Sequence, residues 1–92
     1  MQTVWKYAIP MSSEFTLQMP RGAKPLTVQT QQGAPMMWAL VDDAAPMVEH
    51  RFALVGTGHP IDYADRYLGS FQYLGTFQAA GGQLVWHLFL RH

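Results

Sequence analysis

Apolar and polar residues alternate along most of this chain with a period of two. That spacing places successive apolar side chains on one face of an extended segment, as expected for half-buried β-strands. Turns rich in glycine, proline or aspartate separate the alternating runs. The sequence therefore predicts strands at residues 5–9, 15–19, 26–29, 36–41, 48–55 and 84–90.

The run at residues 36–41 is apolar on both faces. Such a strand is either central in a two-layer fold or placed at a contact between subunits. Residues 61–67 lack the alternation, and Pro60 with Asp62 favours a short helical turn there.

A six-residue repeat, YLGSFQ at residues 67–72 and YLGTFQ at 73–78, leaves two alternatives open. An even repeat keeps each side chain on the same face, so both copies could form one long strand. That strand would carry on one face Tyr67, Phe71, Tyr73 and Phe77. Alternatively, the first copy lies in a loop.

These elements predict one all-β domain over residues 1–92, a small antiparallel β-sandwich or barrel of six to seven strands with at most one short helical turn. A chain of 92 residues is long enough for one modest core.

Charged residues make up only 13% of the chain, while apolar residues make up 49%. A surface so poor in charge must be largely neutral polar or apolar, and apolar patches commonly become contacts with other chains. We therefore expect a homo-oligomer, with Met36 and Trp38 as interface candidates. The six basic residues are scattered and balance six acidic ones, which argues against binding of duplex nucleic acid.

The absence of cysteine excludes disulfides and thiolate metal sites. No apolar run approaches the roughly 20 residues needed to span a bilayer. The first residues also lack the basic start and apolar stretch of a signal peptide. We expect a cytoplasmic protein with no membrane partner and no cofactor.

The segment Gly56-Thr-Gly-His-Pro60 follows a buried strand and is the candidate binding site. Two glycines so close permit positive φ and could turn successive N–H groups toward one anion, although an ordinary turn has the same composition. In the binding interpretation the ligand is small, anionic and nucleotide-like. Gly56, Thr57 and Gly58 would hold its phosphate, His59 or Arg51 would add charge, and Tyr63 or Tyr67 would stack on its base.

Other chemistry finds little support in the sequence. No serine lies in a Gly-x-Ser-x-Gly elbow, and the Gly-Thr-Gly-His turn lacks the lysine of a phosphate-binding P-loop. The four histidines are too widely separated to predict a metal site. We expect His50 and His87 to pair by hydrogen bonds within the sheet, and Asp42 and Asp43 to cap backbone N–H groups in a turn. No catalytic residues are predicted.

Several blocks carry a family resemblance that covers most of the chain. They are Trp5-Lys-Tyr7, Met19-Pro-Arg-Gly-Ala-Lys24 with Val28-Gln29, Trp38-Ala-Leu-Val-Asp42, Arg51-Phe52, Gly56-Thr-Gly-His-Pro-Ile61, Leu74-Gly-Thr-Phe-Gln78, Gly81-Gly82 and Leu84-Val-Trp-His-Leu-Phe89. With these blocks the chain resembles a family of small bacteriophage and prophage proteins of uncharacterised function. The extra copy at residues 67–72 departs from that pattern. The resemblance implies a phage origin and a host-cytoplasmic setting, and it supplies no reaction and no catalytic residues.

The leading hypothesis is a non-enzymatic, phage-encoded accessory binding protein of the host cytoplasm. As a counter-defence factor it would either sequester a small nucleotide-like ligand or block a host protein. The alternatives are a structural or assembly protein of the virion and, last, a metal-dependent phosphoesterase around His59.

Overall fold

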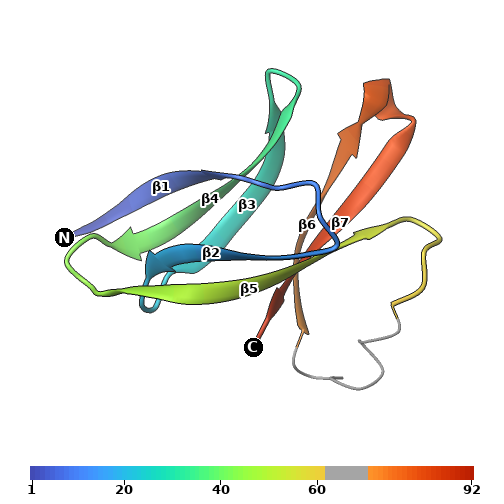
Figure 1. The fold of residues 1–92 in the computed structure, drawn as a ribbon. Helices are drawn as coiled ribbons and strands as arrows, with labels where there is room; N and C mark the ends of the chain where they lie inside the picture. Colours follow the sequence, from blue (N-terminus) through green and yellow to red (C-terminus); the bar gives the residue numbers. More distant parts are fainter. Residues whose placement is uncertain (62–70) are drawn as a thin grey trace.

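A computed structural model describes residues 1–61 and 71–92. Within these residues the chain forms seven β-strands and one 3-10 turn, η1 (Figure 1). The bounds are β1 Gln2–Ala8, β2 Glu14–Pro20, β3 Lys24–Gln31, β4 Ala34–Asp42, β5 Met47–Gly56, β6 Phe71–Ala79, η1 Ala80–Gly82 and β7 Leu84–Arg91. The predicted all-β class is confirmed.

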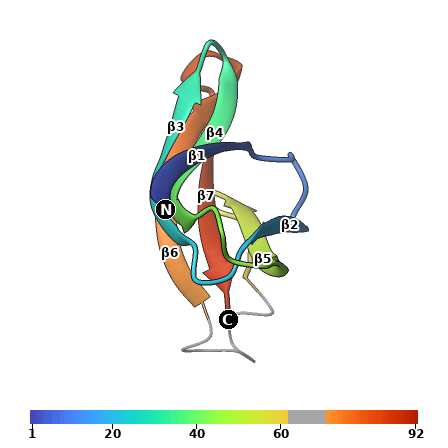
Figure 2. The same cartoon turned by 90° about the vertical axis from the view of Figure 1, so that its left-hand side faces the viewer.

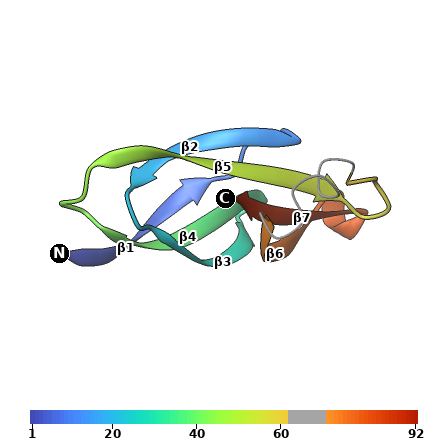
Figure 3. The same ribbon diagram turned by 90° about the horizontal axis from the view of Figure 1, so that it is seen from below.

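The strands form two antiparallel sheets that pack face to face as a sandwich. One sheet has three strands in the order β1-β4-β3, and the other has four in the order β2-β5-β7-β6. Figures 2 and 3 show β2 and β5 standing in a layer apart from β1 and β4, while β6 lies beside β3. β4 runs between β1 and β3. Of the two alternatives for the strand with two apolar faces, a central position in a two-layer fold is therefore confirmed.

The core fills the space between the two sheets. Met37 and Ala39 of β4 are fully buried and face the four-stranded sheet, whose Phe52 and Leu88 are equally enclosed. Full burial of a large apolar side chain stabilises the fold by about 1.5–3 kcal/mol. The alternation predicted for residues 15–19 is confirmed, because every second side chain of β2 from Phe15 onward turns toward this core.

One side of the sandwich is closed by β3 and β6, which lie side by side although they belong to different sheets. Gly75 permits this approach, since a Cβ atom at that position would lie only 3.0 Å from the Cβ of Val28. Nearby, the Thr30 hydroxyl donates a hydrogen bond to the carbonyl oxygen of Gln78 at 3.2 Å.

Two β-bulges interrupt the predicted alternation. In β3 the register shifts between Pro25 and Thr27, so Leu26 is 55% exposed while Val28 is buried. In β6 the register shifts between Tyr73 and Gly75, so Tyr73 is 57% exposed while Phe77 is buried. The alternation expected within residues 26–29 is therefore interrupted, and the one-strand alternative for the repeat is wrong in placing Tyr73 and Phe77 on one face, because one extra residue moves every later side chain to the opposite face.

The described residues contain one helical turn, η1, in the connection between β6 and β7. Its Gly81 and Gly82 have φ values of 68° and 92°. The helical turn predicted over residues 61–67 falls outside the described residues except for Ile61, and the first repeat copy falls outside them as well. Nothing helical within residues 1–61 and 71–92 has the length and hydropathy needed to cross a membrane.

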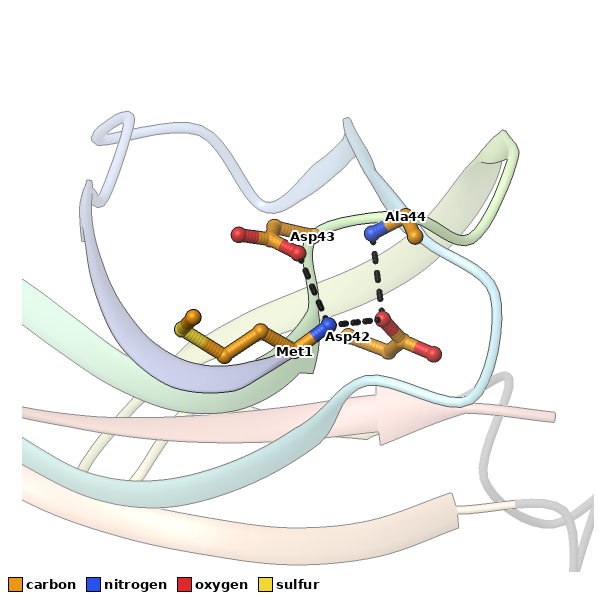
Figure 4. Close-up of polar contacts among 4 residues, drawn as sticks. All are labelled: Met1, Asp42, Asp43 and Ala44. Atoms are coloured by element: carbon orange, nitrogen blue, oxygen red, sulfur yellow. Dashed lines mark hydrogen bonds and ion pairs between the residues drawn. The ribbon is translucent and has the colours of Figure 1, made fainter.

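In the turn between β4 and β5 the predicted capping of a backbone N–H is confirmed for Asp42, whereas Asp43 bonds the amino group of Met1 (Figure 4). Asp42 Oδ1 accepts a hydrogen bond from the Ala44 N–H at 3.0 Å and another from the amino group of Met1 at 3.2 Å. Asp43 Oδ1 accepts from the same amino group at 3.1 Å. The Ala44 N–H and then the Met1 ammonium stabilise the ionised carboxylate, which lowers the pKa of Asp42.

A candidate binding pocket at the Gly56–Pro60 turn

The turn that follows β5 uses its own backbone donors. The His59 N–H donates to the Gly56 carbonyl oxygen at 3.0 Å and closes a four-residue turn, with Gly58 at a φ of 85° in the third position, where a type II turn favours glycine. The Thr57 N–H donates to the Val85 carbonyl oxygen at 3.0 Å. The predicted nest of converging amides is therefore wrong for these two donors, because neighbouring carbonyls already satisfy them.

Gly56 does not have a positive φ; its role in the turn comes from the room that its missing side chain leaves. A Cβ atom at Gly56 would lie 2.8 Å from His59 Nδ1 and 3.2 Å from Trp86 Cζ3. The missing side chain lets the His59 ring fold back over the end of β5. There the ring meets Trp86 of β7 edge to face, with centroids 6.0 Å apart and an interplanar angle of 78°.

These two rings form one wall of a pocket. Its volume is about 350 Å³, and it lies between the turn and the segment that precedes β2. The described lining residues are Met11, Ser12, Ser13, Leu54, Val55, Gly56, His59, Pro60 and Trp86. Among them His59 has the one titratable side chain. A mostly apolar hollow with a few polar groups is the usual form of a small-molecule site.

On the other side of the turn, a row of hydrogen bonds fixes Thr57. Its hydroxyl lies 2.7 Å from His87 Nε2, and the Thr76 hydroxyl lies 2.9 Å from His87 Nδ1. Tyr73 continues the row with a hydrogen bond between its hydroxyl and that of Thr76. The Thr57 side chain thus holds the turn against β7 and β6.

The predicted pairing of His50 with His87 is wrong. His50 lies opposite Leu17 of β2, and its buried Nε2 has no hydrogen-bond partner in the described part of the chain. The partners of His87 are the two threonine hydroxyls. No group of three or more His, Cys, Asp or Glu side chains within residues 1–61 and 71–92 is placed to hold a metal ion.

Arg51 is not brought to the pocket. It lies five residues before Gly56 on β5, which corresponds to about 17 Å along an extended strand. Its Nε lies 3.8 Å from Glu49 Oε1, and its cross-strand neighbours are Thr16 and Arg91. The predicted stacking residues Tyr63 and Tyr67 lie outside the described residues.

Sequence reasoning missed several contributors to the pocket, among them Trp86, Ser12 and Ser13. Trp86 is directly cross-strand from Gly56. That pairing depends on the β5–β7 register, which the sequence pattern does not contain. The serines were considered only as nucleophiles, although a short loop before a strand is a usual place for pocket-lining residues.

The two predicted interface residues lie together on the outer face of the three-stranded sheet. Met36 and Trp38 point away from the core side of β4, on the same face as Leu40 and its cross-strand neighbour Val4. Val4 is 49% exposed, and the three β4 side chains are half-buried. We call these four residues the outer apolar face.

Over its full length, residues 1–92, the chain matches the family described as "Domain of unknown function (DUF7352)". No curated protein and no solved structure is significantly similar to it.

Proposed function

The chain belongs to the DUF7352 family, and we propose that it is a non-enzymatic, phage-encoded accessory protein that sequesters a small nucleotide-like ligand in the host cytoplasm. By removing such a ligand it would act as a counter-defence factor. The phage setting is supported by the resemblance of the sequence blocks described above. The observation that carries the binding proposal is the pocket beside the Gly56–Pro60 turn, where His59 and Trp86 meet.

The local chemistry favours binding over catalysis. Nucleophilic catalysis requires a nucleophile and a base within hydrogen-bond reach of each other, in a site where substrate can bind. Of the pocket hydroxyls, that of Ser12 donates to the carbonyl oxygen of Glu14 at 3.0 Å. The Thr57–His87 pair does have the required distance, but the Thr57 amide and hydroxyl both anchor the turn.

Isothermal titration calorimetry with a panel of cyclic and linear nucleotides and their nucleosides tests the proposal. We expect heat of binding from at least one member and a marked loss of affinity in His59→Ala, because His59 forms part of the pocket wall. His92→Ala is the matched control, since His92 bonds Gln72 at 3.2 Å and does not line the pocket. Absence of heat with every member would contradict sequestration.

A second candidate function, blockade of a host protein, is favoured by the outer apolar face. Lys6 and Lys24 are cross-strand neighbours of Trp38 and Leu40, so the apolar centre is flanked by positive charge. Large apolar side chains that are partly exposed together on one face of a sheet are typical of a surface that contacts another protein. The same face would also form the contact between subunits in the homo-oligomer that the composition predicts.

Affinity capture from host lysate and light scattering on the pure protein separate these two uses of the face. If a host protein is the target, one stoichiometric partner is retained by wild type and lost in Trp38→Ser. Met47→Ser is the control, because Met47 is 52% exposed at the start of β5 and lies outside the face. A stable oligomer that Trp38→Ser dissociates would assign the face to self-association instead.

A further inference from the structure

We infer that the pocket recognises the uncharged heteroaromatic part of its ligand, a nucleobase or a ring system of similar size, and leaves any phosphate outside. This inference rests on the proposed sequestration function and specifies its ligand class. It departs from the anion-binding interpretation of the same turn, and three observations on the described residues lead to it.

The first observation is the charge of the pocket. Its described lining contains neither Lys, Arg, Asp nor Glu. Transfer of a phosphate from water into an apolar hollow is unfavourable unless a cation or several hydrogen-bond donors compensate for the lost hydration. Arg51, the cation that the sequence offered for this purpose, lies on another part of β5 beside Glu49.

The second observation concerns the hydrogen-bond donors. Backbone N–H groups at glycine-rich turns bind phosphate only when they are free and converge. Here the Thr57 N–H bonds Val85 and the His59 N–H bonds Gly56, each at 3.0 Å. The Thr57 hydroxyl lies 2.7 Å from His87 Nε2. Two of the turn's amides and the Thr57 hydroxyl are therefore already engaged within the protein.

The third observation is what the pocket does offer. His59 and Trp86 stand nearly perpendicular, and Leu54, Val55 and Met11 supply apolar walls. A planar ring gains contact against such surfaces whatever its substituents, because every nucleobase has a π face. The His59 ring nitrogens and the Ser13 hydroxyl are polar groups of the kind that bond ring nitrogens and exocyclic amino groups. A volume of about 350 Å³ is at the lower end for ligand pockets and suits one ring system.

The test compares three probes on the whole chain: the four ribonucleosides, their 5′-monophosphates and inorganic phosphate. We expect at least one nucleoside to bind with an affinity similar to that of its monophosphate, with little change between low and high salt. Inorganic phosphate should not compete. His59→Ala should weaken nucleoside binding about tenfold or more, as for loss of an aromatic stacking contact, while His92→Ala should not.

The outcomes distinguish this inference from the function on which it rests. Binding of monophosphates alone, with strong dependence on salt, would overturn the neutral-ring class and leave sequestration standing. Binding of none of these probes and of no member of the wider nucleotide panel would overturn both. Because His59 is an exposed side chain, His59→Ala is expected to fold, and a circular dichroism spectrum like that of wild type verifies this. Gly56→Ala provides a second variant that displaces the same ring.

Discussion

Glycine is required at position 56, the last residue of β5, because a side chain there would clash with its neighbours, and not because the backbone has a positive φ. Gly56 is a buried strand residue, and the room left by its missing side chain is occupied by the His59 ring. The glycine therefore decides where an imidazole lies relative to Trp86. The pocket wall formed by His59 and Trp86 therefore depends on the absence of a side chain at Gly56.

Gly56→Ala tests this arrangement. The added Cβ would lie 2.8 Å from His59 Nδ1, so the ring must move, and we expect a loss of stability of about 1–3 kcal/mol. Urea denaturation followed by tryptophan fluorescence measures it. In the His59→Ala background the same change should cost clearly less, because the main clashing group is gone. An equal cost in both backgrounds would show that the His59 contact is not the cause.

Tyr7 offers a second residue-level prediction. Its hydroxyl is buried without a hydrogen-bond partner in the described part of the chain, and burial raises its pKa. Tyr7→Phe removes this unsatisfied group, so we expect stability to be unchanged or to rise by up to about 1 kcal/mol. Tyr73→Phe, which deletes a hydroxyl bonded to Thr76, should instead lower stability. A clear destabilisation by Tyr7→Phe in chemical denaturation would contradict the assignment.

At the scale of elements, the alternation of apolar and polar residues predicts where the strands lie but does not reveal the β-bulges within them. β2, β4, β5 and β7 were predicted within a few residues, because an uninterrupted alternating or, in β4, wholly apolar run marks each of them between turn residues. Leu26 and Tyr73 were placed on the wrong faces, because a bulge leaves no mark in the alternation until its partner strand is known. For the same reason the pocket was predicted only in part: the turn is visible in the sequence, whereas the Gly56–Trp86 pairing is a property of register.

The contact between β3 and β6 yields a prediction about how the sheets meet. At Gly75→Ala the new methyl group would lie 3.0 Å from the Cβ of Val28, and we expect a destabilisation of about 1–3 kcal/mol. Val28→Ala keeps its Cβ but removes the methyl group at 3.1 Å, so the double variant should recover part of the loss. Denaturation curves of both single variants and the double variant form the cycle. Strict additivity would mean that the two residues do not interact.

The β4–β5 turn gives a prediction about pH. The pKa of Asp42 is lowered from its ordinary value of 3.8, so its contribution to stability is present above that value and is lost as pH falls through the folded-state pKa. Asp42→Asn should therefore flatten the acid side of the profile of thermal midpoint against pH. The effect should be small, because the carboxylate is exposed. If the thermal midpoint of the variant falls at acid pH as steeply as that of wild type, Asp42 does not contribute to the pH dependence of stability.

At the scale of the whole molecule, both sheets share a single core. Its members come from β2, β3, β4, β5, β6 and β7, with Ile9 in the connection after β1. Neither sheet has a second apolar layer of its own to bury against. The sandwich should consequently unfold as one unit.

We therefore expect one cooperative transition in urea. Far-ultraviolet circular dichroism and tryptophan fluorescence should give the same midpoint, since Trp5, Trp38 and Trp86 are distributed over both sheets. Two separated transitions would contradict the single-domain description.

The strand order also bears on synthesis. β5 pairs on one side with β2, which is synthesised before it, and on the other with β7, which is synthesised after it. Until β7 arrives, the edge of β5 and its apolar end are without their neighbour, and open strand edges recruit other chains. Nascent chains that stall before residue 84 should accordingly depend on chaperones far more than the finished protein does.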